Sequence, residues 1–102
     1  MSLDINQEIQ DFFHTKNAYL LDVRVRQEYR DGHIPGSINV PLEAIEKVRL
    51  LVRQKDTPVF VYCQTGNRGW KVVEAMEKMG YTNVKDIGGI AGYRGKLERT
   101  KG

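Results

Sequence analysis

Four short runs of mainly apolar residues, separated by polar and glycine-containing segments, predict β-strands along this chain. The runs are residues 19–23 (YLLDV), 37–40 (SINV), 59–62 (VFVY) and 83–87 (NVKDI). The run 59–62 is the most hydrophobic and is rich in β-branched and aromatic residues, which is typical of a central, buried strand. The segments between these runs have a different periodicity.

Apolar residues at helical spacing predict amphipathic helices between the strands. The apolar positions are Ile5, Ile9, Phe12 and Phe13 in the first helix, Leu42, Ile45, Val48, Leu51 and Val52 in a second, and Val72, Val73, Met76 and Met79 in a third. Asp4 can cap the first helix, and Gly80 ends the third. Residues 26–31 have helical composition up to Gly32, and the glycine-rich residues 88–98 end in a weakly helical stretch.

Strands that alternate with helices predict an α/β fold with three layers, in which helices cover both faces of a mainly parallel sheet. In such sheets, ligands bind beyond the carboxyl ends of the strands. Cys63 directly follows the most hydrophobic strand. It therefore lies where this fold class places its binding sites.

Composition limits the kind of protein this can be. With 102 residues, the chain is expected to form one domain, residues 1–102, and no apolar stretch approaches the roughly 18 residues of a membrane span. The net charge of +3 comes from Lys and Arg spread along the chain, which favours small anions over nucleic acid. One cysteine allows no internal disulfide and no cysteine metal cluster. We see no signal peptide and expect a reducing, cytoplasmic location.

The segment CQTGNR, residues 63–68, has the features of an anion-binding loop. It runs from a strand end into a helix start, where free N–H groups carry partial positive charge, and Gly66 can turn those groups inward. Together with Arg68, this field favours the thiolate of Cys63, which is then a usable nucleophile, partly accessible at the base of a pocket. The alternative is that Cys63 is a small buried hydrophobe.

Three motifs in order resemble a known family. The segments LLDVRVRQEYRDGHIPGSINVPL, VFVYCQTGNRG and GYTNVKDIGGIAGY, between Leu20 and Tyr93, are similar to those of a single-domain rhodanese, a sulfurtransferase. The resemblance implies a rhodanese fold and a Cys63 that carries sulfur as a persulfide. Thiosulfate or a related donor would supply the sulfur, and cyanide or a thiol would accept it, without a metal or another cofactor.

The resemblance also implies roles for the neighbours of Cys63. The loop that binds the donor and stabilises the persulfide would comprise Gln64, Thr65, Gly66, Asn67 and Arg68. The alternative for Arg68 is a structural ion pair with a carboxylate. From their position just past the loop, Trp70 and Lys71 are candidates for the pocket rim, although an exposed Trp70 could equally bind a partner. Asp22, Arg24 and Glu28 are expected to form a structural ion-pair network, and His33 is expected to be part of the scaffold.

The chain departs from the family pattern at two positions. Many members have Ser after the loop arginine and Trp at the end of the final motif, where this chain has Gly69 and Tyr93. Losing the Ser hydroxyl removes one potential hydrogen-bond donor near the loop, whereas Tyr93 keeps an aromatic ring. The uncharged Gln64 and Thr65 leave the identity of the donor open.

Two other functions compete with sulfur transfer. A cysteine phosphatase also holds a thiolate in an amide-lined loop, but it has five residues between Cys and Arg, whereas Cys63 and Arg68 enclose four. The shorter loop suits a single sulfur better than a phosphoryl group. The second alternative is a non-catalytic or carrier rhodanese module that binds a partner protein. Neither nucleic acid nor a membrane is expected as a partner.

Overall fold

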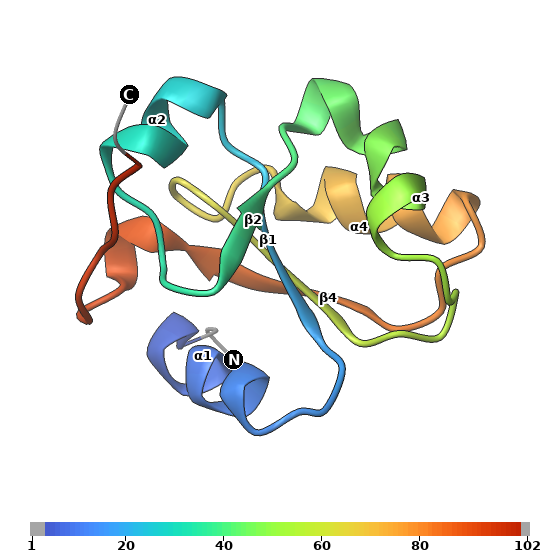
Figure 1. The fold of residues 1–102 in the computed structure, drawn as a ribbon, viewed down its shortest axis with the longest axis horizontal. Coiled ribbons are helices and arrows are strands. Elements are labelled where there is room, and N and C mark those ends of the chain that lie inside the picture. Colours follow the sequence, from blue (N-terminus) through green and yellow to red (C-terminus); the bar gives the residue numbers. More distant parts are fainter. Residues whose placement is uncertain (1–3, 101–102) are drawn as a thin grey trace.

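The four predicted strands form one parallel sheet in the computed structural model, which describes residues 4–100. The strands are β1 (Tyr19–Asp22), β2 (Ser37–Asn39), β3 (Val59–Cys63) and β4 (Val84–Gly89), and their order across the sheet is β2-β1-β3-β4 (Figure 1). Every residue of β3 is buried, which confirms its prediction as a central strand. The strand also extends one residue further than predicted and includes Cys63.

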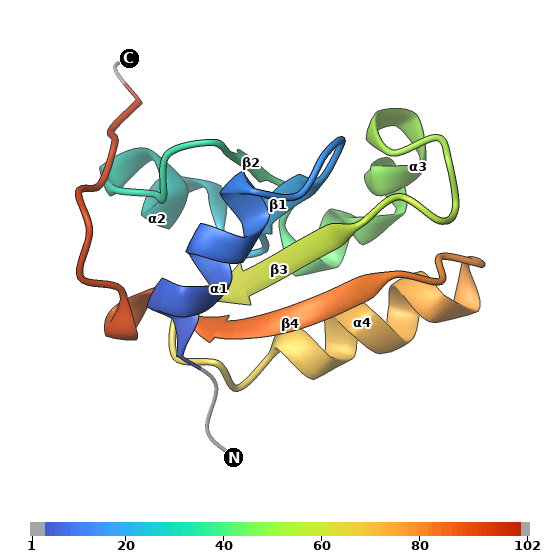
Figure 2. The same cartoon turned by 90° about the horizontal axis from the view of Figure 1, so that it is seen from below.

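Helices cover both faces of this sheet, as the pattern predicted. They are α1 (Ile5–Phe13), α2 (Arg26–Asp31), α3 (Val48–Leu51) and α4 (Gly69–Lys78), with 3-10 helices η1 (Leu42–Lys47) and η2 (Ile90–Gly92). The helix α1 lies on one side of the sheet, and α3 and α4 lie on the other (Figures 1 and 2). Among residues 4–100, no helix is long and apolar enough to cross a membrane.

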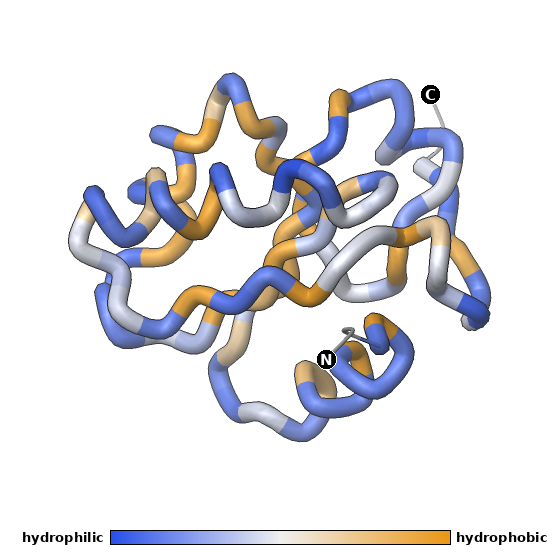
Figure 3. The backbone as a smooth tube through the Cα atoms, turned by 180° about the vertical axis from the view of Figure 1, so that it is seen from behind, coloured by the Kyte–Doolittle hydropathy of each residue, from blue (hydrophilic) through white to orange (hydrophobic). Residues whose placement is uncertain are grey.

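Side-chain alternation along β3 divides the hydrophobic core into two parts. Val59, Val61 and Cys63 belong to a cluster that includes residues of α3 and α4, whereas Phe60 and Tyr62 belong to a second cluster with residues of α1. This alternation follows from the two-residue period of a strand. Figure 3 shows the hydrophobic positions recurring along the central strands. The sulfur of Cys63 is therefore on the α4 side of the sheet.

The first helix begins as predicted, because the Asp4 carboxylate accepts the backbone N–H of Asn6 at 3.0 Å. The prediction that Phe13 shares the buried face is wrong, since Phe13 is 57% exposed. The Phe12 ring contacts Phe60, at a centroid distance of 5.7 Å. The next side chain on a helix is rotated by about 100°, which turns Phe13 toward solvent.

Two other helix predictions need correction. The segment after Pro41 is not one regular helix, because η1 contains a non-helical residue, Ala44, before α3 begins. Leu42, Ile45 and Val48 are spaced by three, the period of a 3-10 helix, so this geometry also aligns them. The predicted weak helix near the C-terminus is absent, because the backbone of Glu98 pairs instead with that of His33.

Candidate active site

The sheet order brings the carboxyl ends of β1 and β3 side by side. The chain passes from β1 to β2 on one side of β1 and returns to β3 on the other side. The direction in which strands are added to the sheet therefore reverses between β1 and β3. Ligands of open parallel sheets bind in the crevice beyond such a reversal. The reversal places Cys63, at the end of β3, next to Arg24, which follows β1.

Cys63 is 4% exposed, so the expectation of a partly accessible sulfur is wrong. The reason is that β3 continues through Cys63 and includes its side chain in the core cluster on the α4 side, together with Val72. The side chains of the following loop are mostly exposed, among them those of Gln64, Thr65 and Asn67. The sulfur is therefore almost closed off from solvent in this conformation, beneath a loop whose side chains are exposed.

The loop directs a backbone N–H at the sulfur. The N–H of Gly66 donates to Cys63 Sγ at a distance of 3.0 Å. Gly66 has a φ of +89°, a conformation that favours glycine, and this turn points its N–H back toward the strand end. A hydrogen bond from an N–H group stabilises negative charge on sulfur more than it stabilises the neutral thiol.

Two hydrogen bonds hold Gln64, the first residue of the loop. Its side-chain Oε1 accepts from Arg24 Nη1 at 3.1 Å, and its backbone carbonyl accepts the N–H of Ala91 at 3.0 Å. Gly89 packs directly against the loop, since a Cβ atom added to it would lie 2.6 Å from the carbonyl carbon of Thr65. A register shift between β3 and β4 pairs Gly89 with Cys63 and creates this close approach.

Arg24 links the loop to the centre of the sheet. Its guanidinium is bound to the buried carboxylate of Asp22, with Nη2 at 2.7 Å from Oδ2, and it also donates to the carbonyl of Gly32 at 2.6 Å. Asp22 and Arg24 thus form the predicted ion pair. Glu28 was expected to join it, but among residues 4–100 its exposed carboxylate makes no ion pair.

Arg24→Met should reduce the free energy of unfolding by about 3–5 kcal/mol, because it leaves the Asp22 carboxylate buried without a counter-charge. Urea unfolding measures this loss. The matched control is Arg49→Met, which breaks the exposed pair between Arg49 and Glu46 and should cost less than about 1 kcal/mol. Equal losses for the two variants would contradict the structural role of Arg24.

A carboxylate that the sequence analysis missed lies next to the loop. Asp86 of β4 is half-buried, and its Oδ1 accepts the N–H of Gly88 at 3.0 Å. A Cβ atom on Gly69 would lie 2.3 Å from the Asp86 carboxyl, so this carboxyl occupies the space that a serine side chain would need. Burial raises the pKa of Asp86 above its ordinary value of 3.8, which means that its ionised form is disfavoured in the folded protein.

The raised pKa of Asp86 gives a pH-dependent prediction. A carboxyl with a raised folded-state pKa contributes stability at low pH and loses it as the pH rises through that pKa. Asp86→Asn keeps an acceptor for Gly88, so at neutral pH it should be more stable than the parent protein. In urea unfolding this gain should shrink as the pH approaches 3.8. Asp56→Asn, which removes the same charge from an exposed position, is the matched control, and a gain at Asp86 that stays constant with pH would contradict the account.

The remaining predicted site residues lie around the start of α4. Arg68 is the N-terminal capping residue of α4, and its side chain is exposed. Trp70 is 56% exposed, and Lys71 lies near its ring, with Nζ 5.7 Å from the ring centroid. The buried His33 stacks on Tyr29, and its Nδ1 lies 2.8 Å from the Tyr29 carbonyl, which fits the scaffold role.

Residues 6–96 match the sequence profile of the rhodanese-like domain family. The chain is 38% identical over 71 residues to thiosulfate sulfurtransferase PspE of Escherichia coli, covering 69% of this chain and 68% of that protein. It is 36% identical over 96 residues to adenylyltransferase and sulfurtransferase uba4 of Ogataea parapolymorpha, covering 93% of this chain but only 25% of that longer protein. A solved structure described as a rhodanese with anions from E. coli superposes with a TM-score of 0.75, at 32% identity, over 81% of this chain and 99% of that one.

The parallel four-stranded sheet with helices on both faces is a rhodanese fold, as the superposition on the solved rhodanese shows. The chain belongs to the rhodanese-like domain family. Its fold is the one that the three sequence motifs implied.

Proposed function

We propose that the protein is a sulfurtransferase, which moves a sulfane sulfur from thiosulfate or a related donor to cyanide or a thiol through a persulfide on Cys63. One observation carries the proposal: the N–H of Gly66 lies 3.0 Å from Cys63 Sγ, in a loop held in place at Gln64. Preorganised N–H donors of this kind stabilise anionic sulfur without reorganisation during the reaction.

The reaction has two steps that share one nucleophile. The Cys63 thiolate attacks the outer sulfur of thiosulfate, a new S–S bond forms, and the S–S bond of thiosulfate breaks so that sulfite leaves with the electron pair. The acceptor then attacks the terminal sulfur of the persulfide, and the Cys63 thiolate is regenerated. When cyanide is the acceptor, the product is thiocyanate.

In this proposal the loop residues bind the donor and stabilise the persulfide, and the exposed aromatic ring nearby forms part of the rim. The loop set is Gln64, Thr65, Gly66, Asn67 and Arg68, and the rim residues are Trp70 and Lys71. The positive charge of Arg68 at the start of α4 suits an anionic donor. We place the reaction in the cytoplasm, as the sequence predicts.

Steady-state kinetics with thiosulfate and cyanide test this function. Because a single cysteine serves both steps, we expect ping-pong kinetics, with parallel lines in double-reciprocal plots. A donor panel that includes organic persulfides then ranks the donors. Absence of turnover with every donor, together with efficient hydrolysis of an aryl phosphate, would support a cysteine phosphatase instead.

Arg68→Ala should leave a functional but slower enzyme. Removing the guanidinium takes one charge-assisted contact from the donor, so we expect the KM for thiosulfate to rise about tenfold while the persulfide still forms. Arg53→Ala removes another exposed charge elsewhere and should leave KM unchanged. A KM for Arg68→Ala equal to that of this control would exclude a donor-binding role.

A sulfur-carrier function is the second candidate. The relative named adenylyltransferase and sulfurtransferase is about four times as long as the matched segment, so related domains occur within larger proteins. In that case Cys63 would deliver its sulfur to a protein acceptor. Assays of the same donor panel with and without candidate acceptor proteins distinguish the two functions, because a carrier turns over rapidly only when its acceptor protein is present.

A further inference from the structure

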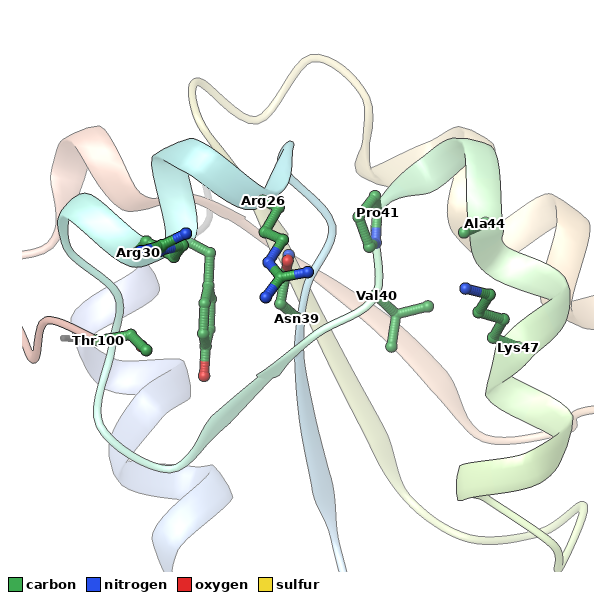
Figure 4. Close-up of a pocket in the computed structure, with 9 residues that line it drawn as sticks. Arg26, Arg30, Asn39, Val40, Pro41, Ala44, Lys47 and Thr100 are labelled. Atoms are coloured by element: carbon green, nitrogen blue, oxygen red, sulfur yellow. The ribbon is translucent and has the colours of Figure 1, made fainter. Parts of the chain in front are cut away.

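A cavity of about 420 Å³ lies beside the edge strand β2, between α2 and η1 (Figure 4). Its charged lining residues are Arg26 and Arg30 of α2 and Lys47 of η1. Its apolar lining residues are Tyr29 of α2, Val40 and Pro41, which follow β2, and Ala44 of η1. Neither Cys63 nor the loop 64–68 contributes to the lining.

Within the described part of the chain, the cations of this cavity have no carboxylate partner at ion-pair distance. No carboxylate lines the cavity, and within residues 4–100 Arg26, Arg30 and Lys47 form no ion pair, although other cations of the described chain do. Arg26 and Lys47 point from opposite sides toward the space over Val40 (Figure 4). Arg26 and Arg30 are also like charges four residues apart on α2, an arrangement that slightly destabilises a helix.

The apolar wall of the cavity is held in a fixed orientation. The hydroxyl of Tyr29 donates to the Ser37 carbonyl at 2.7 Å, and its ring stacks on the buried His33 at a centroid distance of 3.8 Å. Val40 is itself only 6% exposed. The apolar wall is therefore preformed, and the cationic groups lie around it, as in small-molecule binding sites.

We propose that this cavity is a second binding site, separate from Cys63, for an organic anion that carries two or more carboxylate or phosphate charges on an apolar scaffold. The scaffold lies on Tyr29, Val40 and Pro41, and the charged groups are bound by Arg26, Arg30 and Lys47. This ligand is neither the sulfur donor nor the acceptor of the proposed reaction.

Size and position favour this ligand class over a small inorganic anion. A volume of about 420 Å³ lies within the range of small-molecule sites, whereas thiosulfate or sulfate would leave most of the apolar wall uncovered. The cavity is also at the outer edge of the sheet. With β1 between β2 and β3, strand spacing alone places β2 roughly 10 Å from the strand that carries Cys63.

Isothermal titration calorimetry at constant ionic strength tests the proposal with defined probes. The probes are trimesate, an aromatic tricarboxylate, and phenyl phosphate, with neutral trimesamide and sulfate as comparisons. We expect saturable one-to-one binding of at least one organic anion, weakened about tenfold or more by the double substitution Arg26→Gln and Lys47→Gln. The matched control, Arg53→Gln with Lys16→Gln, removes the same charge from exposed positions elsewhere and should leave binding within about twofold of the parent protein.

The outcomes separate this site from the one at Cys63. Preference for trimesate or for phenyl phosphate identifies carboxylate or phosphate as the favoured group. Cys63→Ser should bind the probe as the parent does, and the double substitution at Arg26 and Lys47 should take up sulfur from thiosulfate at the parental rate. The proposal is overturned if neither organic anion binds, if sulfate or trimesamide binds as tightly, if the control pair weakens binding equally, or if sulfur uptake falls.

Discussion

Cys63→Ser should reduce the formation of thiocyanate from thiosulfate and cyanide to the uncatalysed background. A hydroxyl is un-ionised at neutral pH and forms no persulfide, so both steps lose their nucleophile. The substitution is nearly isosteric, and the serine oxygen can still accept the Gly66 N–H that now lies 3.0 Å from the sulfur. We therefore expect the melting temperature to stay close to that of the parent protein.

A folded Cys63→Ser protein that turns over at the parental rate would show that Cys63 is not the nucleophile. Cys63 is the only cysteine of the chain, so no second thiol can replace it. If Cys63 is only a buried hydrophobe, the parent protein and Cys63→Ser should not differ in thiocyanate formation. The two interpretations of Cys63 thus predict opposite effects of Cys63→Ser on thiocyanate formation, namely complete loss or no change.

Gly89→Ala should reduce the rate of sulfur transfer by about 100-fold or more. The added Cβ would lie 2.7 Å from both the Gln64 carbonyl oxygen and the Gly66 nitrogen, and these backbone atoms must move away. The displacement separates the Gly66 N–H from the sulfur, and misplacement by about 1 Å is enough for a loss of this size. Overpacking should also lower the free energy of unfolding by about 1–3 kcal/mol.

The matched control for Gly89→Ala is Gly92→Ala in the adjoining η2 helix. A Cβ on Gly92 would meet Ile5 at 3.7 Å, an ordinary van der Waals contact, so this variant should retain nearly full activity. Rates are compared per folded protein, as measured by circular dichroism. Similar rates for the two alanine variants would show that the close packing of Gly89 does not position the loop next to Cys63.

The sequence predicts the strands because each is a local apolar run bounded by turn residues, as with Val59 to Tyr62. It also places Cys63 correctly, since a cysteine at a strand end followed by a glycine-containing polar loop is a local pattern. The 3-10 geometry of η1 was missed because residues spaced by three fit both helix types. The exposure of Phe13 depends on which aromatic ring packs against the sheet.

Other features of the site depend on contacts between distant segments. Arg24 reaches Gln64 only because β1 lies next to β3 in the sheet. Asp86 approaches Gly69, and Gly89 approaches the loop, because α4 packs on β4 and the register shifts near Cys63. No periodicity or motif in the sequence specifies these contacts. The buried position of the sulfur likewise depends on α4, because β3 continues through Cys63 and its side chain packs in the cluster on the α4 side.

The intact mass of the protein after exposure to thiosulfate, before and after addition of cyanide, tests the central claim most directly. The account predicts that thiosulfate alone adds the mass of one sulfur atom per chain, and that cyanide removes it with the release of thiocyanate. While the persulfide is present, no free Cys63 thiol should remain to be alkylated. An unchanged mass with thiosulfate and with every organic persulfide donor, while the thiol stays free, would contradict the account.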